Sequence, residues 1–220
     1  MTRSGAGGEW RWGRSEYRLI LIVDIEEFSA AYRNDTIRVR LQASLQGLLT
    51  TTFSATGIDE AQFTMDTTGD GWLVTIAPAV GKPRILGPVV DRLAAGLRRR
   101  NRRADQAERL RLRLVLHAGD LLSDQVGGFV GDQLNFAFRL LDAQQFRVLL
   151  ERASGPVVAC VSDEVYRQVI AQRHEGLDPA AFEPVWFECK KARALGWVRA
   201  PGESGLAGRA GLFAKDVLMT

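Results

Sequence analysis

The clearest apolar run of the chain spans residues 17–24 and ends in an acid, Asp24. An unbroken run of β-branched and aliphatic residues predicts a strand that is covered on both faces. Alternating apolar and polar residues predict two more strands that form a hairpin, because the tetrad TGDG between them has turn chemistry and places Asp70 at the tip. Further strands are predicted over residues 110–117 and 157–161, with a last hairpin over residues 185–198.

Helical spacing of apolar residues appears in several other segments. A helix is expected from about Asp35, with Asn34 or Asp35 as its cap. Others are expected over residues 83–101 and 132–141 and after Ser162. Helices and strands alternate irregularly around a central hairpin, so the pattern favours an α+β fold with helices on one side of the sheet.

Composition restricts the class of protein. The 220 residues are 46% hydrophobic, which is ordinary for one soluble globular domain. A net charge of +3 is too small for a dedicated nucleic-acid binder. The longest apolar stretch is far shorter than the roughly 20 residues that span a bilayer, and no signal peptide is visible. The two cysteines form no metal-binding motif with the histidines. We therefore expect a cytoplasmic protein without membrane contact and regard nucleic acid as an improbable partner.

The chain divides into three predicted parts. Residues 1–15 are rich in Gly, Ser and Arg and are expected to be a flexible N-terminal arm. Residues 16–200 form the predicted folded domain, and residues 201–220 are a C-terminal extension. Within the domain, residues 98–103 contain five arginines. These arginines are a solvated last helical turn that suits the helix dipole, a nucleic-acid patch, or a contact for acidic ligands.

Asp24 and Asp70 carry the candidate chemistry. If their strands are neighbours, the two carboxylates can approach a common point, where they repel each other unless divalent cations neutralise them. Oxygen ligands of this kind suit magnesium or manganese that bridges a phosphate chain. Gly69 and Gly71 would let the backbone approach a ligand closely. On spacing alone, Asp24 as a helix cap and Asp70 as a turn former remain an open alternative.

Three segments in the same order resemble the nucleotide cyclase homology domain of the class III cyclases. Residues 23–29 (VDIEEFS) resemble the first metal-binding strand and loop, and residues 67–71 (TTGDG) resemble the second metal site. Residues 131–140 (GDQLNFAFRL) resemble the transition-state helix, and residues 114–119 (LVLHAG) match the strand before it. The resemblance implies a ferredoxin-like catalytic domain with a central, mostly antiparallel sheet and helices packed on it.

The resemblance also assigns metal ligands and phosphate contacts. Two divalent cations, Mn²⁺ or Mg²⁺, would be held by Asp24, Asp70 and the carbonyl of Ile25. The triphosphate would be bound by backbone amides at a helix start and by a late lysine, which implicates Glu27, Phe28, Ser29, Lys190 and Lys191. Ordinary surface lysines are the alternative for the last two. The side chains of Glu26 and Glu27 are expected to point outward, away from phosphate.

Asn135 and Arg139 lie four residues apart, hence on one helix face. By resemblance, Asn135 holds the ribose and Arg139 meets the charge that grows on the α-phosphate, and both come from the partner subunit. This implies a head-to-tail homodimer with two composite sites. An exposed polar pair on an amphipathic helix is the alternative. His117 receives no catalytic role and is expected to be a hydrogen-bonded strand histidine.

Base choice depends on two positions. The family reads the base three residues before the metal-site glycine, with lysine for adenine and glutamate for guanine. Here this position is Asp66, an acceptor when ionised, which disfavours adenine and suits guanine, uracil or cytosine. The second position falls near Gly128, which has no side chain. Phe129, Phe136 and Phe138 either shrink the base pocket toward a pyrimidine or serve helix packing.

With no sensor or membrane module attached, the chain resembles the short pyrimidine cyclases of bacterial antiphage (Pycsar) systems. The implied reaction converts UTP, or else CTP, to its 3′,5′-cyclic monophosphate and pyrophosphate, as a second messenger for a separately encoded effector protein. Uridine is preferred because the short side chain of Asp66 needs only one imino donor. A guanylate- or adenylate-type signalling cyclase and a catalytically silent nucleotide-binding module are the alternatives.

Overall fold

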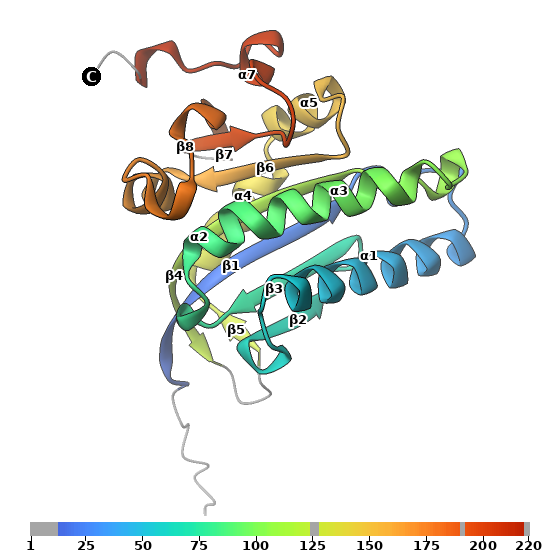
Figure 1. Ribbon diagram of the computed structural model, residues 1–220, viewed down its shortest axis with the longest axis horizontal. Helices are drawn as coiled ribbons and strands as arrows, with labels where there is room; N and C mark the ends of the chain where they lie inside the picture. The colour runs from blue at the N-terminus through green and yellow to red at the C-terminus, as the bar shows by residue number, and fades with distance from the viewer. Residues whose placement is uncertain (1–12, 124–127, 190–191, 218–220) are drawn as a thin grey trace, which may run out of the picture.

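The computed structural model describes residues 13–123, 128–189 and 192–217. Its centre is an eight-stranded sheet with the strand order β2-β3-β1-β4-β6-β8-β7, and β5 pairs with the end of β4 (Figure 1). Among the described strands, only β4 and β6 pair in parallel. The strands are β1 (Ser15–Ile25), β2 (Phe63–Thr67), β3 (Gly71–Ile76), β4 (Leu112–Ser123), β5 (Phe129–Val130), β6 (Val157–Ser162), β7 (Glu183–Cys189) and β8 (Ala192–Arg199).

The α-helices are α1 (Asp35–Ala55), α2 (Lys82–Arg84), α3 (Val90–Asn101), α4 (Asp132–Asp142), α5 (Gln144–Arg152), α6 (Asp163–Val165) and α7 (Leu206–Arg209). The start of α1 is fixed by Asn34, whose side chain accepts a hydrogen bond from the Ile37 N–H at 3.0 Å. A π-helical turn over Ile85–Val89 joins α2 to α3 and accommodates Pro88, which has no N–H to donate.

The first part of the chain forms a ferredoxin-like unit. Its elements follow in the order β1, α1, β2, β3, α3 and β4, and its strands lie in the order β4-β1-β3-β2. The predicted ferredoxin-like α+β fold with a mostly antiparallel sheet is therefore confirmed. β1 lies near the middle of the sheet, where β3 and β4 flank it over most of its length.

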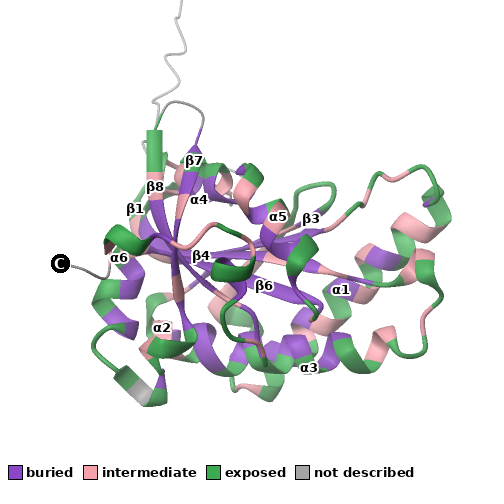
Figure 2. Ribbon diagram, turned by 90° about the horizontal axis from the view of Figure 1, so that it is seen from above, coloured by how far each residue is buried: buried purple, intermediate pink, exposed green. Residues whose placement is uncertain are grey.

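Helices cover both faces of the sheet, so the prediction of helices on one side is wrong. Leu21 and Val23 of β1 face a core that includes α1 and α3, whereas Ile20 and Ile22 face a second core that includes α4 and α5. Figure 2 shows the buried strands between helices whose outer sides are exposed. The physical reason lies in β1 itself, because a strand that is apolar at successive positions must be covered on both sides.

The described part of the C-terminal extension packs on the domain. Leu206 and Ala207 of α7 are buried in the second core, and Phe213 forms an antiparallel bridge with Val185 of β7. In the described part of the chain, no helix has both the length and the apolar character needed to cross a membrane.

Candidate functional site

The β2–β3 hairpin brings Asp70 to Asp24. Antiparallel pairing places Asp24 at the end of β1 opposite Gly71, and the N–H of Ile25 donates to the carbonyl of Asp70 at 3.0 Å. This close approach requires glycine, because a Cβ on Gly71 would lie 1.9 Å from the carbonyl oxygen of Val23. The two carboxyl groups are consequently close enough for Asp70 to favour the protonated form of Asp24, through its charge and as a hydrogen-bond acceptor.

Asp24 is only 4% exposed, and its environment disfavours the ionised form. The pKa of Asp24 is raised to about 6, mainly by burial and also by the neighbouring Asp70, while Arg113 opposes both effects. At neutral pH, Asp24 therefore carries its charge at a cost in folding free energy. A divalent cation between the two carboxylates would relieve that cost.

Arg113 is a site residue that was not predicted from the sequence. It lies on β4 directly opposite Asp24, and its Nε and Nη2 donate to Asp24 Oδ2 at 2.9 and 2.5 Å. Its Nη1 donates to the carbonyl of Leu141 at the end of α4, at 3.2 Å. Residues 110–117 alternate apolar and polar positions, so an arginine was visible there, but its position beside Asp24 depends on the β1–β4 register.

A cavity of about 470 Å³ contains both carboxylates and Arg113. Its wall continues along residues 25–30 and is completed by Arg147, Leu150 and Glu151 of α5. The helix α5 was not predicted, although Phe146, Leu149 and Leu150 have helical spacing and are buried. The cavity therefore combines oxygen ligands for a cation with guanidinium groups for an anion.

The loop after β1 differs from its prediction. Residues 26–29 form a turn instead of a helix start, and α1 begins only at Asp35. Glu27 has a φ of +54°, which breaks the helical geometry, and its carboxylate accepts a hydrogen bond from Tyr32 at 2.5 Å. Among the described residues, no acceptor is bound by the backbone amides of Glu27, Phe28 or Ser29, so these amides have hydrogen-bonding capacity for a phosphate.

Glu26 does not point outward, contrary to the prediction. Its half-buried side chain forms an ion pair with Arg111 at 3.1 Å. The pairing follows from the backbone, because the Glu26 N–H donates to the carbonyl of Arg111 at 2.9 Å and so brings the two residues together. Burial raises the pKa of Glu26, and the Arg111 guanidinium opposes that effect.

Asn135 and Arg139 are exposed on α4 and do not line the cavity of Asp24 and Asp70. One chain therefore does not assemble all four side chains. His117 is hydrogen-bonded as expected, through Nδ1 to Ser162 at 2.7 Å and through Nε2 to Gln133 at 2.8 Å. Burial lowers the pKa of His117, which favours the neutral ring.

The base-recognition candidates do not line the cavity of Asp24 and Asp70. Asp66 is exposed on the edge strand β2, and Gly128 precedes β5. Phe129, Phe136 and Phe138 are partly buried against the second core, and Phe136 contacts the His117 ring at 5.0 Å between centroids. This packing favours their structural role over a role in the base pocket. Lys190 and Lys191 lie outside the described residues.

The donor set fits magnesium or manganese. It consists of the Asp24 and Asp70 carboxylates with the backbone of Ile25 beside them, and all the ligands it offers are hard oxygens. In the described ranges, no group of three or more His, Cys, Asp or Glu side chains forms a metal cage. A cation held here would therefore complete its shell with water and substrate phosphate, as Mg²⁺ commonly does.

No protein-family model matches the chain, and no curated protein matches it either. Solved structures do match. The guanylyl cyclase Cya2 is 17% identical, with a TM-score of 0.58 over 87% of this chain and 95% of that chain. An adenylate/guanylate cyclase/hydrolase from Silicibacter pomeroyi is 20% identical, with a TM-score of 0.60 over 86% of this chain and 99% of that chain.

A third match is the guanylate cyclase domain of RhGC from Catenaria anguillulae, solved in complex with GTP. It is 14% identical, with a TM-score of 0.56 over 86% of this chain and all of that chain. The fold of this protein is therefore that of class III adenylate and guanylate cyclase catalytic domains.

Proposed function

We propose that this protein is a metal-dependent nucleotide cyclase, which converts a nucleoside triphosphate to its 3′,5′-cyclic monophosphate and pyrophosphate. The observation that carries the proposal is the meeting of Asp24 and Asp70 in one cavity with Arg113. The cyclase fold supports the proposal, because the strand end with Asp24 and the hairpin tip with Asp70 are the two segments whose sequences resemble the metal sites of cyclases.

The residues of the cavity suit an in-line phosphoryl transfer. Divalent cations bound by the carboxylates would lower the pKa of the ribose 3′-hydroxyl and neutralise phosphate charge. Arg113 offers a guanidinium to the phosphate chain, and the amides of residues 27–29 have no other acceptor among the described residues. The 3′-oxygen forms a bond to the α-phosphorus, the bond to the pyrophosphate oxygen breaks, and the 3′-hydroxyl proton leaves to solvent.

The site is proposed to be shared between two copies of the chain in a head-to-tail homodimer. Asn135 and Arg139 are exposed and outside the cavity, which suits residues that act on the neighbouring subunit. At the paired ends of β4 and β5, Leu122 and Val130 are 38% and 52% exposed, and they provide apolar surface for subunit contact.

UTP is proposed as the substrate, followed by CTP, and the cyclic product as a second messenger in antiphage defence with a separate effector protein. The support is Asp66, an exposed acceptor that suits the imino group of uracil. The guanine base of GTP also has hydrogen-bond donors for Asp66. The identity of the product therefore has to distinguish a pyrimidine cyclase from a guanylate-type signalling cyclase. Incubation of the full chain with Mn²⁺ and equal amounts of ATP, GTP, CTP and UTP, followed by mass spectrometry, measures that identity directly.

Two variants test the catalytic assignment. Asp70→Asn and Arg139→Ala should each reduce turnover by about 10²- to 10³-fold, the typical cost of losing a group that stabilises transition-state charge. Asp142→Asn and Arg152→Ala, at exposed positions of α4 and α5, serve as controls and should retain activity. Four intact triphosphates after incubation of a dimeric preparation would overturn the proposal.

Complementation tests the shared site. In an equal mixture of Asp24→Asn and Arg139→Ala chains, half of the dimers are mixed, and each mixed dimer has one intact site. Recovery to about a quarter of wild-type activity is therefore expected. If mass spectrometry of differently tagged chains shows mixed dimers without any recovery, the two residues do not act across subunits.

A silent nucleotide-binding module is the second candidate, and the Arg113 ion pair favours it. The two hydrogen bonds from Arg113 to Asp24 both go to Oδ2, so the arginine competes with a cation for that oxygen. This candidate predicts Mn²⁺-dependent binding of a nucleoside triphosphate with no release of pyrophosphate. Calorimetry combined with a pyrophosphate-release assay separates the two functions.

A further inference from the structure

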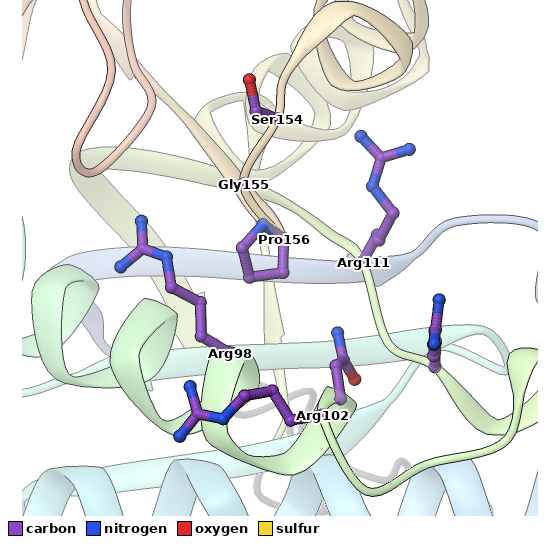
Figure 3. Close-up of a pocket in the computed structure, with 8 residues that line it drawn as sticks. Arg98, Arg102, Arg111, Ser154, Gly155 and Pro156 are labelled. Atoms are coloured by element: carbon purple, nitrogen blue, oxygen red, sulfur yellow. The ribbon is translucent and has the colours of Figure 1, made fainter.

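A second cavity of about 470 Å³ lies at the C-terminal end of α3, next to the segments that lead into β4 and β6 (Figure 3). Four arginines line it, Arg98, Arg102, Arg109 and Arg111, together with residues 154–156. Among the described residues, no carboxylate lines this cavity. Two of the four arginines belong to the arginine-rich segment at residues 98–103, and the other two lie in the segment just before β4.

The fold holds these arginines in place from two sides. Arg98 lies in the last turn of α3 and Arg102 is the residue that caps its C-terminal end. Figure 3 shows both side chains extending to the left of their backbone, with Arg98 beside Pro156 and Arg102 below it. Asn101, the last residue of α3, fixes the segment before β4 to the helix. Its side chain donates to the Leu110 carbonyl at 2.7 Å and accepts from the Leu110 N–H at 3.0 Å. The residues on either side of Leu110 are Arg109 and Arg111.

The positive charge of the cavity is compensated only in part, because Glu203, which accepts hydrogen bonds from the lining residues Ser154 and Gly155, is itself paired with Arg209. In the described part of the chain, Arg102 and Arg109 have no ion-pair partner, and Arg98 donates only to the carbonyl of Pro201. Arg111 has one carboxylate, Glu26, which lies outside this cavity. The helix dipole accounts for basic residues in the last turn of α3, but it does not account for the arginines that precede β4.

We propose that this cavity binds a small polyphosphate anion, either an inorganic chain or the phosphate chain of a nucleotide. Guanidinium groups bind phosphate oxygens through paired N–H donors, and several of them match the several charges of a polyphosphate. The exposed N–H groups of Arg102 and Arg109 supply free donors. The site is separate from Asp24 and Asp70 and requires no bound metal.

The lining argues for a small anion and against a nucleic-acid strand. Proteins that bind single strands stack the bases on aromatic side chains, and no aromatic side chain lines this cavity among the described residues. The net charge of +3 is also modest for a chain that binds a polymer of phosphates. The arginines are gathered around a hollow, which suits a compact ligand.

Calorimetry of the full chain with inorganic triphosphate, in EDTA, tests the proposal without turnover. Arg102→Gln combined with Arg109→Gln should raise the Kd about 100-fold, at about tenfold for each lost charged contact. The matched control combines Arg99→Gln with Arg103→Gln, which removes the same charge from exposed positions outside the cavity. Its Kd should stay within about twofold of the wild-type value.

Three results would overturn the proposal. The first is the absence of binding to wild-type protein at millimolar triphosphate, and the second is an equal loss of affinity in the control. The third is a loss of binding in Arg147→Gln alone, which would place the anion in the cavity of Asp24. A fourth arm uses a single-stranded oligonucleotide, and binding of that probe in place of triphosphate would identify a nucleic-acid surface instead.

A nucleoside triphosphate arm distinguishes the two sources of the anion. Affinity equal to that of inorganic triphosphate assigns the site to the phosphate chain alone, and tighter binding assigns it to a nucleotide. In both cases the site stands only if the Arg102 and Arg109 substitutions weaken binding. Because EDTA removes the cations that turnover needs, failure of this experiment leaves the proposed cyclase activity untouched.

Discussion

Replacement of Asp24 by asparagine should change how the stability of the protein depends on pH. Burial beside Asp70 raises the pKa of Asp24 to about 6, against about 3.9 for a free aspartate. The folded chain therefore binds this proton more tightly than the unfolded chain does. Stability consequently falls as pH rises from about 4 to about 6 and then levels off.

The size of the effect follows from the same values. A difference of about two pKa units corresponds to about 3 kcal/mol, and about half of it falls between pH 5 and pH 8. An asparagine side chain cannot ionise, so this component should be missing from the variant. Between pH 5 and pH 8, the free energy of unfolding of Asp24→Asn should therefore rise by about 1.4 kcal/mol relative to that of wild type. This corresponds to about 3 to 5 °C in Tm for a chain of this size.

Urea unfolding of both proteins at pH 5 and pH 8, in EDTA, measures this difference. The exposed Asp105 provides the matched control, since Asp105→Asn should follow the wild-type pH dependence. Added Mn²⁺ at pH 8 should stabilise wild type by about 2.7 kcal/mol at 100 times its Kd and leave Asp24→Asn unchanged. Parallel loss of stability in wild type and Asp24→Asn would refute the reasoning, because Asp24 would then carry no charge penalty.

Two further predictions concern the groups around Asp24. Gly71→Ala should destabilise the protein by about 2 kcal/mol or more in urea unfolding, because its Cβ would lie 1.9 Å from the Val23 carbonyl oxygen. The control is Gly47→Ala on α1, where the Cβ enters open space and should stabilise the protein by about 1 kcal/mol. Equal effects of the two substitutions would refute the contact. Arg113→Gln removes the guanidinium that lowers the pKa of Asp24, so in EDTA the pH midpoint at which stability falls should move upward. Arg147→Gln is the control, and an unchanged midpoint in Arg113→Gln would contradict the assignment.

Elements with strong local signals could be predicted from the sequence. The run of apolar residues over β1, the turn residues of the β2–β3 hairpin and the Asn34 cap of α1 each determine their structure within a few residues. Such features are set by local propensity and by the side-chain period of a strand or helix. The same locality explains why the meeting of Asp24 and Asp70 was predictable, because one hairpin and one neighbouring strand are sufficient for it.

Features that depend on packing between distant segments could not be read in this way. Arg113 reaches Asp24 only because β4 pairs with β1 in one particular register. The turn at residues 26–29 replaces the expected helix start because Glu27 adopts a positive φ that no propensity scale indicates. The contact between Glu26 and Arg111 likewise joins residues 85 positions apart.

The covering of both sheet faces limits how a second copy of the chain can approach. Layers of helix already occupy the surfaces on which another protein would pack broadly. In the proposed homodimer, subunit contact would then use strand ends, loops and the paired ends of β4 and β5, and the hairpin tip with Asp70 is one of those loops. Association and completion of the reaction centre would thus be a single event, so specific activity should rise with protein concentration until every chain is paired.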